Sequence, residues 1–494
     1  MGTKHRFEPD FYDRLGVDPS VDDDTLRQQY RLLARLFHPD VNKAPDAHQR
    51  FVGIRESYDV LGDPGLRAEY DTWLAAQRPE AFLLRVVHTL GPKALRLSAG
   101  RQRLYALVEL EVVDEETPEA LPINLVLVLD RSSSMRGERL YHAQRAVRLI
   151  SQHLGPRDRL GIVTFSDRAQ VILPAGPYMQ PEVVASAMNS IRTGGGTEIS
   201  SGLEAGLREA LRGHSPNVIS HIILLTDGQT YGDEERCLEL AGQAARHRIG
   251  LTLFGLGADW NDRLLDEMAR RAGGEAFHIA EPADAVEAFK KRLDVLRRTA
   301  ANETRLAFAL QPGVELLAVH QVMPSLQRLS TNSNGHIPVG QLLKGVPARL
   351  LLEFAVTPER DRRVLLVAQL SAATTLLSRN TTVTQTRLLV SQARDITVDD
   401  LEFPESIVDA AERVAALRLQ QHTWEAVEKG NRVTAEIQLA YLATRFLEIG
   451  EPGLAAITKR ELAFLRKTGA LSSEGSKRIK YGTRQLSLPP PEEI

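Results

Sequence analysis

Five side chains with carboxylate or hydroxyl oxygens lie where stretches expected to form buried strands end. Such oxygens are hard ligands, so they suit Mg²⁺, Mn²⁺ or Ca²⁺ and bind zinc poorly. No histidine or cysteine stands among them. The sequence therefore predicts a site for a divalent cation, with Mg²⁺ as the expected ion and Mn²⁺ or Ca²⁺ as alternatives. The expected ligands are Asp130, Ser132, Ser134, Thr197 and Asp227.

The spacing of these residues favours one shared site. Asp130 ends the apolar run "INLVLVLD" and opens a D-x-S-x-S turn, and Asp227 ends the run "HIILLTD". Thr197 closes the loop "TGGGT", whose glycines allow backbone angles that other residues avoid and a close approach to an ion. An aspartate at a strand end or a serine turn is usually only a cap or a loop. The three pieces in this order argue against a chance match.

The segment 121–299 has the pattern of a mostly parallel sheet with helices on both faces. Short apolar stretches alternate with amphipathic helical stretches along it. We therefore expect a doubly wound, Rossmann-like α/β domain. Because ligands of such sheets bind beyond the carboxyl ends of the strands, this fold would bring the five expected ligands together.

Three motifs, "LVLDRSSSM", "GGGTEISSGL" and "LLTDG", resemble those of the von Willebrand factor A (vWA) domain with its metal-ion-dependent adhesion site (MIDAS), over residues 121–299. The resemblance implies direct metal binding by the hydroxyls of Ser132 and Ser134, and by Thr197 in one state. Asp130 and Asp227 would act partly through water. An open coordination position would then receive an aspartate or glutamate from a protein partner.

A catalytic role for the same site is a competing hypothesis. An oxygen-ligated metal can activate water, and Glu198 beside Thr197 is the one candidate for a general base. No other histidine or carboxylate in the motifs is an evident base, and no G-x-x-x-x-G-K-[ST] motif for ATP phosphates occurs. We expect a binding module and not an enzyme, with no catalytic residues in this chain.

A second group of polar residues lies near the amino-terminal end, between two expected helices. The stretch "DDDTLRQQYRLLARLF" has the spacing of an amphipathic helix, and a second helix is expected at about 47–61. Proline ends the first helix and exposes its neighbours at a rigid corner. On spacing alone, a basic stripe is usually only a solvated surface. The corner is His38, Pro39 and Asp40, and the stripe on the first helix is Arg27, Arg31 and Arg35.

Residues 9–73 closely resemble the J-domain of DnaJ-type co-chaperones. The resemblance rests on tyrosine and "LGV" at the start, "HPD" in the loop, and "SYDVLGDP" and "RAEYD" at the end. It implies that the tripeptide stimulates ATP hydrolysis by a DnaK-type Hsp70 chaperone and that the arginine stripe docks on this partner. The chain lacks the glycine/phenylalanine-rich segment and the CxxCxGxG zinc repeats of larger DnaJ proteins, so client selection must lie in the remaining sequence.

The other segments predict two further units. Alternating apolar stretches separated by Gly, Asn and Pro turns at 82–117 and 303–395 indicate antiparallel strands. We expect one β-sandwich into which the vWA domain is inserted, which is similar to several bacterial vWA proteins. A helical C-terminal region is expected at 404–469, because its helical stretches end in glycine. A linker is expected at 74–81 and a tail at 470–494.

Length and composition indicate a soluble globular protein of two to four domains, which the patterns above predict to be a multidomain α/β protein. It has 494 residues, of which 43% are apolar and 25% charged, and a net charge of −3 that gives no sign of nucleic-acid binding. Cys237 is the single cysteine, which excludes an internal disulfide and a cysteine-rich zinc site. The first ten residues lack the apolar core of a secretory signal, and the apolar runs are too short to span a bilayer. We therefore expect a cytoplasmic protein without membrane insertion.

Two functional hypotheses stay open. In the first, the chain is a co-chaperone adaptor, in which the vWA site binds a protein client through Mg²⁺ and the J-domain recruits an Hsp70 to it. Tethering would raise the concentration of Hsp70 near the client. In the second, the vWA domain is a metal-dependent scaffold that works with an AAA+ ATPase, and the J-domain is vestigial or structural. Dependence on His38 separates the two hypotheses.

Overall fold

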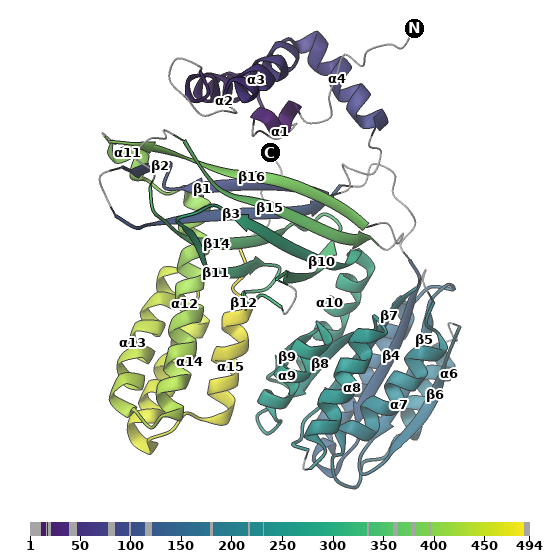
Figure 1. Ribbon diagram of the computed structural model, residues 1–494. Coiled ribbons are helices and arrows are strands. Elements are labelled where there is room, and N and C mark those ends of the chain that lie inside the picture. Colours follow the sequence, from purple (N-terminus) through teal and green to yellow (C-terminus); the bar gives the residue numbers. More distant parts are fainter. Residues whose placement is uncertain are drawn as a thin grey trace.

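The computed structural model has four parts: an N-terminal group of helices, two facing β-sheets, a third sheet covered by helices, and a C-terminal helical bundle (Figure 1). The residues described are 11–15, 17, 21–38, 47–77, 84–97, 100–113, 121–177, 181–215, 218–230, 232–332, 335–358, 364–376, 381–394 and 397–488.

The N-terminal part consists of four helices around a small apolar core. Leu26 and Leu33 on the second helix and Ile54 and Leu61 on the third are buried at helical spacing. These two longer helices therefore close on each other through their apolar faces. The helices are α1 (Phe11–Leu15), α2 (Asp23–Leu36), α3 (Ala47–Leu61) and α4 (Pro64–Gln77).

The fourth helix corrects part of the expected linker, because the beginning of the segment 74–81 belongs to α4. Arg67 on α4 donates hydrogen bonds to the carbonyl oxygen of Val21 over 2.6 Å and to the carboxylate of Asp23 over 3.0 Å. It also donates to the hydroxyl of Tyr12 over 3.1 Å. Polar contacts thus hold α4 against the ends of α1 and α2, and apolar periodicity does not detect such contacts.

Two five-stranded sheets pack face to face and share one core, which confirms the expected β-sandwich. Leu104 and Val108 on β3 lie in this core together with Leu365 and Leu370 of the second sheet. Neighbouring strands are antiparallel except that β2 runs parallel to β16. In spatial order the first sheet is β1 (Leu84–Gly91), β3 (Gln102–Val112), β14 (Ala348–Val356), β11 (Val314–Met323) and β12 (Gln327–Leu329), and the second is β13 (Ile337–Leu343), β10 (Thr299–Leu310), β15 (Val364–Leu376), β16 (Thr381–Ala393) and β2 (Ala94–Arg96).

The third sheet is inserted between β3 and β10 of the sandwich, and its last helix, α10, leads directly into β10. Five of its strands are parallel, and β6 is antiparallel at one edge. This is the doubly wound α/β fold that the alternating pattern predicts. In spatial order the strands are β6 (Ala169–Pro177), β5 (Arg159–Phe165), β4 (Ile123–Asp130), β7 (Ile219–Thr226), β8 (Gly250–Leu256) and β9 (Glu275–Ile279).

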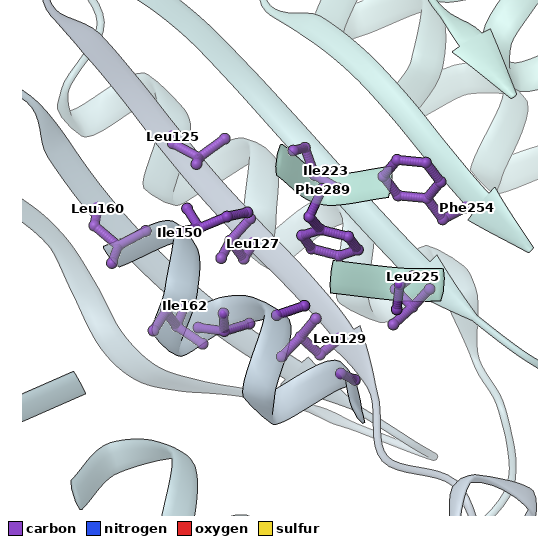
Figure 2. Close-up of a cluster of buried hydrophobic side chains, with 14 of the residues drawn as sticks. Leu125, Leu127, Leu129, Ile150, Leu160, Ile162, Ile223, Leu225, Phe254 and Phe289 are labelled. Atoms are coloured by element: carbon purple, nitrogen blue, oxygen red, sulfur yellow. The ribbon is translucent and has the colours of Figure 1, made fainter. Parts of the chain in front are cut away.

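Helices cover both faces of this sheet because its central strands are apolar on both faces. Leu127 and Leu129 of β4 pack towards α5, α6 and α10, and Figure 2 shows them beside Ile150 and Phe289 of those helices. Val128 of the same strand packs on the other face, towards α7, α8 and α9. The helices are α5 (Glu138–His153), α6 (Pro181–Ser190), α7 (Ile199–Arg212), α8 (Glu234–Arg246), α9 (Asp262–Ala272) and α10 (Ala285–Arg298), with short turns η1 (Ser133–Met135) and η2 (Pro282–Asp284).

The C-terminal bundle covers the outer face of the first sandwich sheet. Leu107, whose neighbours on β3 point into the sandwich, instead packs in one cluster with Ile407 and Leu417 of the bundle. Because side chains alternate along β3, one face of the strand packs in the sandwich core and the other face packs against the bundle. The helices are α11 (Val398–Leu401), α12 (Glu405–Glu428), α13 (Arg432–Glu448), α14 (Pro452–Thr468) and α15 (Ser473–Arg484).

The expected tail at 470–494 is wrong for the residues that form α15. Ile479 and Tyr481 supply the large buried apolar surface of this helix, and its sequence is otherwise mostly polar. Its polar side chains instead reach the vWA-like domain: Lys477 donates to the carbonyl oxygen of Trp260 over 2.6 Å, and Arg484 donates to Asp266 over 2.6 and 2.8 Å. Polar contacts between domains therefore order this segment.

Among the described residues, no helix combines the length and the apolar character needed to cross a bilayer.

Candidate functional site

The predicted metal ligands gather at the carboxyl ends of two neighbouring strands. β4 ends at Asp130, β7 ends directly before Asp227, and the two strands pair in parallel. The chain leaves β4 for β5 on one side, and the later strand β7 lies on the other side. Connections that diverge in this way open a crevice beyond the strand ends, which is the usual ligand site of such sheets.

A chain of hydrogen bonds runs from Ser132 through Ser134 to Asp227. The hydroxyl oxygens of Ser132 and Ser134 are 3.0 Å apart, and Ser134 donates to Oδ1 of Asp227 over 2.8 Å. Asp227 and Ser132 are buried, whereas Ser134 is exposed. The three oxygens therefore meet at one point that solvent reaches from the side of Ser134.

Asp130 lies behind the serines and is fully buried. Its Oδ1 accepts a hydrogen bond from the backbone amide of Ser132 over 2.7 Å, and its Oδ2 accepts one from the hydroxyl of Thr226 over 2.6 Å. Burial raises the pKa of Asp130 to about 6, although the bonds from Thr226 and Ser132 act in the opposite direction. Because both oxygens already accept a hydrogen bond, Asp130 orients the turn and adds negative charge behind it.

The glycine loop places Thr197 beside the strand end of Asp227. Gly195 has φ +83°, and a Cβ there would collide with the carboxylate of Asp167, whose Oδ1 accepts a hydrogen bond from the Gly196 amide over 2.7 Å. The hydroxyl oxygen of Thr197 lies 2.9 Å from the position that a Cβ on Gly228 would take. The loop therefore needs a glycine at 195, and a side chain at 228 would push Thr197 away.

Arg139 is a residue of this site that sequence reasoning missed. It is the second residue of α5, and its guanidinium forms an ion pair with Oδ2 of Asp227. Thr226 and Asp167 were missed as well. Thr226 could have been found because it directly precedes Asp227, but the spacing of Arg139 from the other residues follows no motif.

The donor set fits a hard divalent cation. Within the described ranges, no three His, Cys, Asp or Glu side chains lie close enough together to hold a metal ion. A cation at this crevice would therefore depend on the hydroxyls of Ser132, Ser134 and Thr197, with buried Asp130 and Asp227 as the source of negative charge. Hydroxyl and carboxylate oxygens suit Mg²⁺ and disfavour zinc.

The second predicted group lies on α2 and at its end. Arg27, Arg31 and Arg35 are exposed, and Arg27 forms a weak ion pair with Asp24 at 3.5 Å. His38 is partly buried, with its ring edge-on to Phe51 at 5.3 Å between centroids. The stripe is thus accessible along one helix and leads to the histidine. Pro39 and Asp40 lie outside the described residues.

Comparison with known families divides the chain into three matched segments. Residues 10–71 match the DnaJ domain, residues 124–292 match the von Willebrand factor type A domain, and residues 405–489 match the Sll0103-like, C-terminal alpha-helical domain. The first two matches confirm the resemblances noted in the sequence. The third includes α15.

Relatives match different portions of the chain. Protein sll0103 of Synechocystis sp. is 32% identical over 241 residues, which cover 47% of this chain and 57% of that protein. The chaperone protein DnaJ of Lacticaseibacillus casei is 47% identical over 75 residues, 15% of this chain and 19% of that protein. The chain therefore spans only part of the length of these relatives.

A solved structure shares most of the fold. The von Willebrand factor type A protein from Catenulispora acidiphila superposes with a TM-score of 0.64 at 16% identity, over 82% of this chain and 98% of that one. At this identity, the similarity concerns the fold alone.

Proposed function

Because the chain carries a DnaJ domain, a von Willebrand factor type A domain and an Sll0103-like helical domain, we propose that it is a J-domain co-chaperone and adaptor. Its J-domain would stimulate ATP hydrolysis by a DnaK-type Hsp70 in the cytoplasm. Its vWA domain would bind a protein client or assembly through a Mg²⁺-dependent site. The adaptor itself would have no enzymatic activity, and Glu198 would be only an exposed residue at the start of α7.

The observation that carries the Hsp70 part is the exposed face of α2. Arg27, Arg31 and Arg35 repeat at steps of four, so they project from one side of the helix and leave its apolar face to α3. A row of guanidinium groups is suited to steering and docking on an acidic partner surface. His38 follows directly after this helix, where a docked partner would meet it.

The client-binding part is supported by the donor set at the strand ends. Ser132 and Ser134 would hold Mg²⁺ by their hydroxyls, with Thr197 beside them, and Asp130 and Asp227 would balance its charge. When bound, the ion would offer an open position to a carboxylate of the client. The chain's own groups orient this site without further help, because hydrogen bonds already place the serines against Asp227.

Charge reversal on α2 tests the Hsp70 part. Arg31→Glu should weaken binding to ATP-loaded Hsp70 by about tenfold or more, since one attraction becomes a repulsion. Arg55→Glu, an exposed position on α3, is the matched control and should bind as the wild type does. Affinity is measured by fluorescence anisotropy at two ionic strengths. Equal affinity of the wild type and Arg31→Glu would contradict docking through this stripe.

Thermal unfolding tests the metal part. Mg²⁺ that binds only the folded protein raises its melting temperature with concentration. The shift should occur in the wild type and in Ser190→Ala, an exposed serine on α6, and should be lost in Ser134→Ala. A shift that survives in Ser134→Ala would place the ion elsewhere. A chain that binds Mg²⁺ without binding Hsp70 would instead be a metal-dependent scaffold, for which an AAA+ ATPase is the expected partner.

A further inference from the structure

Arg139 occupies an unusual position beside the candidate metal site. It lies in the first turn of α5, where the positive end of the helix dipole disfavours a cation. Its side chain is only 32% exposed, and its guanidinium pairs with the fully buried carboxylate of Asp227. Arg139 therefore does not stabilise the helix α5 itself. Its contacts with other residues must explain why an arginine occupies this position.

The guanidinium of Arg139 lies at the rim of the crevice, where a glycine leaves space for it. Its Nη2 lies 3.4 Å from the position of a Cβ on Gly257, a glycine with φ +71° that follows β8. The group thus reaches from α5 across the end of β7 to the loop after β8. Ser134 donates to Oδ1 of Asp227, while Arg139 binds Oδ2. The two oxygens of one carboxylate are divided between the serine turn and the arginine.

This division changes the charge of the site. Without Arg139, a divalent cation would meet the carboxylates of Asp130 and Asp227 at the strand ends, and that of Asp167 is bonded to the nearby glycine loop. With Arg139 present, the negative charge of Asp227 is already paired, and a bound divalent cation would lie near this second positive group in a partly buried crevice. The repulsion between Arg139 and the ion weakens the binding of the cation alone and favours the joint binding of a cation and an anion.

We propose that Arg139 makes metal binding depend on a bound carboxylate. It lowers the affinity of the site for the metal ion alone and supplies the positive charge that favours a carboxylate partner. This inference rests on the proposed function, since it assumes a divalent cation at the serine turn. The adaptor would then hold the ion tightly only when a carboxylate is bound with it. An acidic side chain of a protein client has the required chemistry.

A structural role for Arg139 predicts the opposite result. If the guanidinium served only to hold Asp227 in place, its loss would disorder the site and weaken metal binding. If it acts as a competing charge, its loss tightens the binding of the metal alone and removes the benefit of an anion. The sign of the change therefore distinguishes the two roles.

The test titrates Mn²⁺ into the full chain and follows free Mn²⁺ by electron paramagnetic resonance, in buffers of equal ionic strength that contain chloride or acetate. The variants are Arg139→Gln, Arg139→Met and Ser134→Ala. The matched control is Arg136→Gln, an exposed arginine between η1 and α5. Circular dichroism verifies that each variant is folded, and the two substitutions of Arg139 guard against the failure of one to fold.

We expect acetate to tighten the binding of Mn²⁺ to the wild type and to Arg136→Gln. Both Arg139 variants should bind Mn²⁺ in chloride on the order of tenfold more tightly than the wild type, and acetate should no longer help. Equal or weaker binding by the Arg139 variants, with binding lost only in Ser134→Ala, would overturn this inference and leave the metal site intact. If no protein bound more Mn²⁺ than Ser134→Ala, the metal site itself would be refuted as well.

Discussion

The ion-pair cluster around Asp266 gives a quantitative test of how α15 is held to the vWA domain. Asp266 on α9 accepts hydrogen bonds from Arg484 over 2.6 and 2.8 Å and from the hydroxyl of Tyr481 over 2.9 Å. The ammonium of Lys480 lies 2.8 Å from its Oδ2. Asp266→Ala would leave these donors without their shared acceptor.

The expected cost follows from burial and charge. The side chain of Asp266 is 20% exposed, and removal of one partner of a buried ion pair costs about 3 to 5 kcal/mol. Because this pair is not fully buried, we expect a loss of about 3 kcal/mol in the free energy of unfolding. Asp262→Ala is the control, since Asp262 is more exposed and pairs with Lys480, and its loss should cost about 1 kcal/mol.

The pH dependence has a defined sign. Burial raises the pKa of Asp266, but the hydrogen bonds and charges of Arg484 and Lys480 outweigh it and hold the pKa below its usual value of 3.8. A carboxyl group whose pKa is lowered by folding stabilises the protein above its ordinary pKa, and this stability is lost as the pH falls through the folded-state pKa. The difference between the wild type and Asp266→Ala should therefore be complete at neutral pH and shrink in acid.

Urea unfolding followed by tryptophan fluorescence measures this loss in proteins whose other two tryptophans, Trp73 and Trp424, are replaced by phenylalanine. Trp260 is buried at the same interface, with its ring centroid 5.4 Å from that of Tyr481, so its emission reports the release of α15. Because unfolding of a multidomain chain need not be two-state, the transition seen by Trp260 is compared with that seen by circular dichroism. A loss below about 1 kcal/mol at neutral pH would refute a stabilising role of the cluster.

Two further substitutions test the strand ends and the packing behind them. In the presence of a chelator, Asp130→Asn should stabilise the protein. Folding raises the pKa of Asp130 from 3.8 to about 6, so the ionised carboxylate costs stability as the pH rises through 6. A neutral asparagine avoids this cost and should recover up to about 3 kcal/mol at pH 8. Melting curves at pH 8 and pH 5 measure this gain, and identical curves for the two proteins at pH 8 would exclude it. Gly255→Ala should cost about 2 kcal/mol, because any Cβ would collide with the Trp260 ring, whereas Gly100→Ala meets no atom within 4 Å and should be neutral. Chemical denaturation compares the two glycine variants, and equal stability would show that the ring moves aside.

The sequence predicts those parts of the site that depend on strand ends. Asp130 and Asp227 each end an apolar run, so the pattern places both at the carboxyl edge of a parallel sheet, although their direct proximity also needs β4 and β7 to be neighbours. The position of Arg139 does not follow, because its contact with Asp227 depends on which strand neighbours β4. That order is set by the direction in which the connecting helices cross the sheet, and no local spacing encodes it.

The same distinction explains α15 and the end of α4. The helices α12, α13 and α14 are rich in apolar residues and are followed by glycines, so their sequences indicate helices. α15 is ordered by polar contacts with another domain, through residues such as Lys477 and Arg484. α4 is held partly by Arg67 in the same way. Elements stabilised mainly by polar tertiary contacts leave little trace in local hydrophobicity.

The most direct test of the central claim is steady-state ATP hydrolysis by a purified DnaK-type Hsp70 with and without this protein. His38→Gln is the decisive variant, and His48→Gln, an exposed histidine on α3, is its matched control. We expect the wild type and His48→Gln to stimulate hydrolysis and His38→Gln to lose that stimulation. Absence of stimulation by the wild type, or equal stimulation by His38→Gln, would contradict the co-chaperone function.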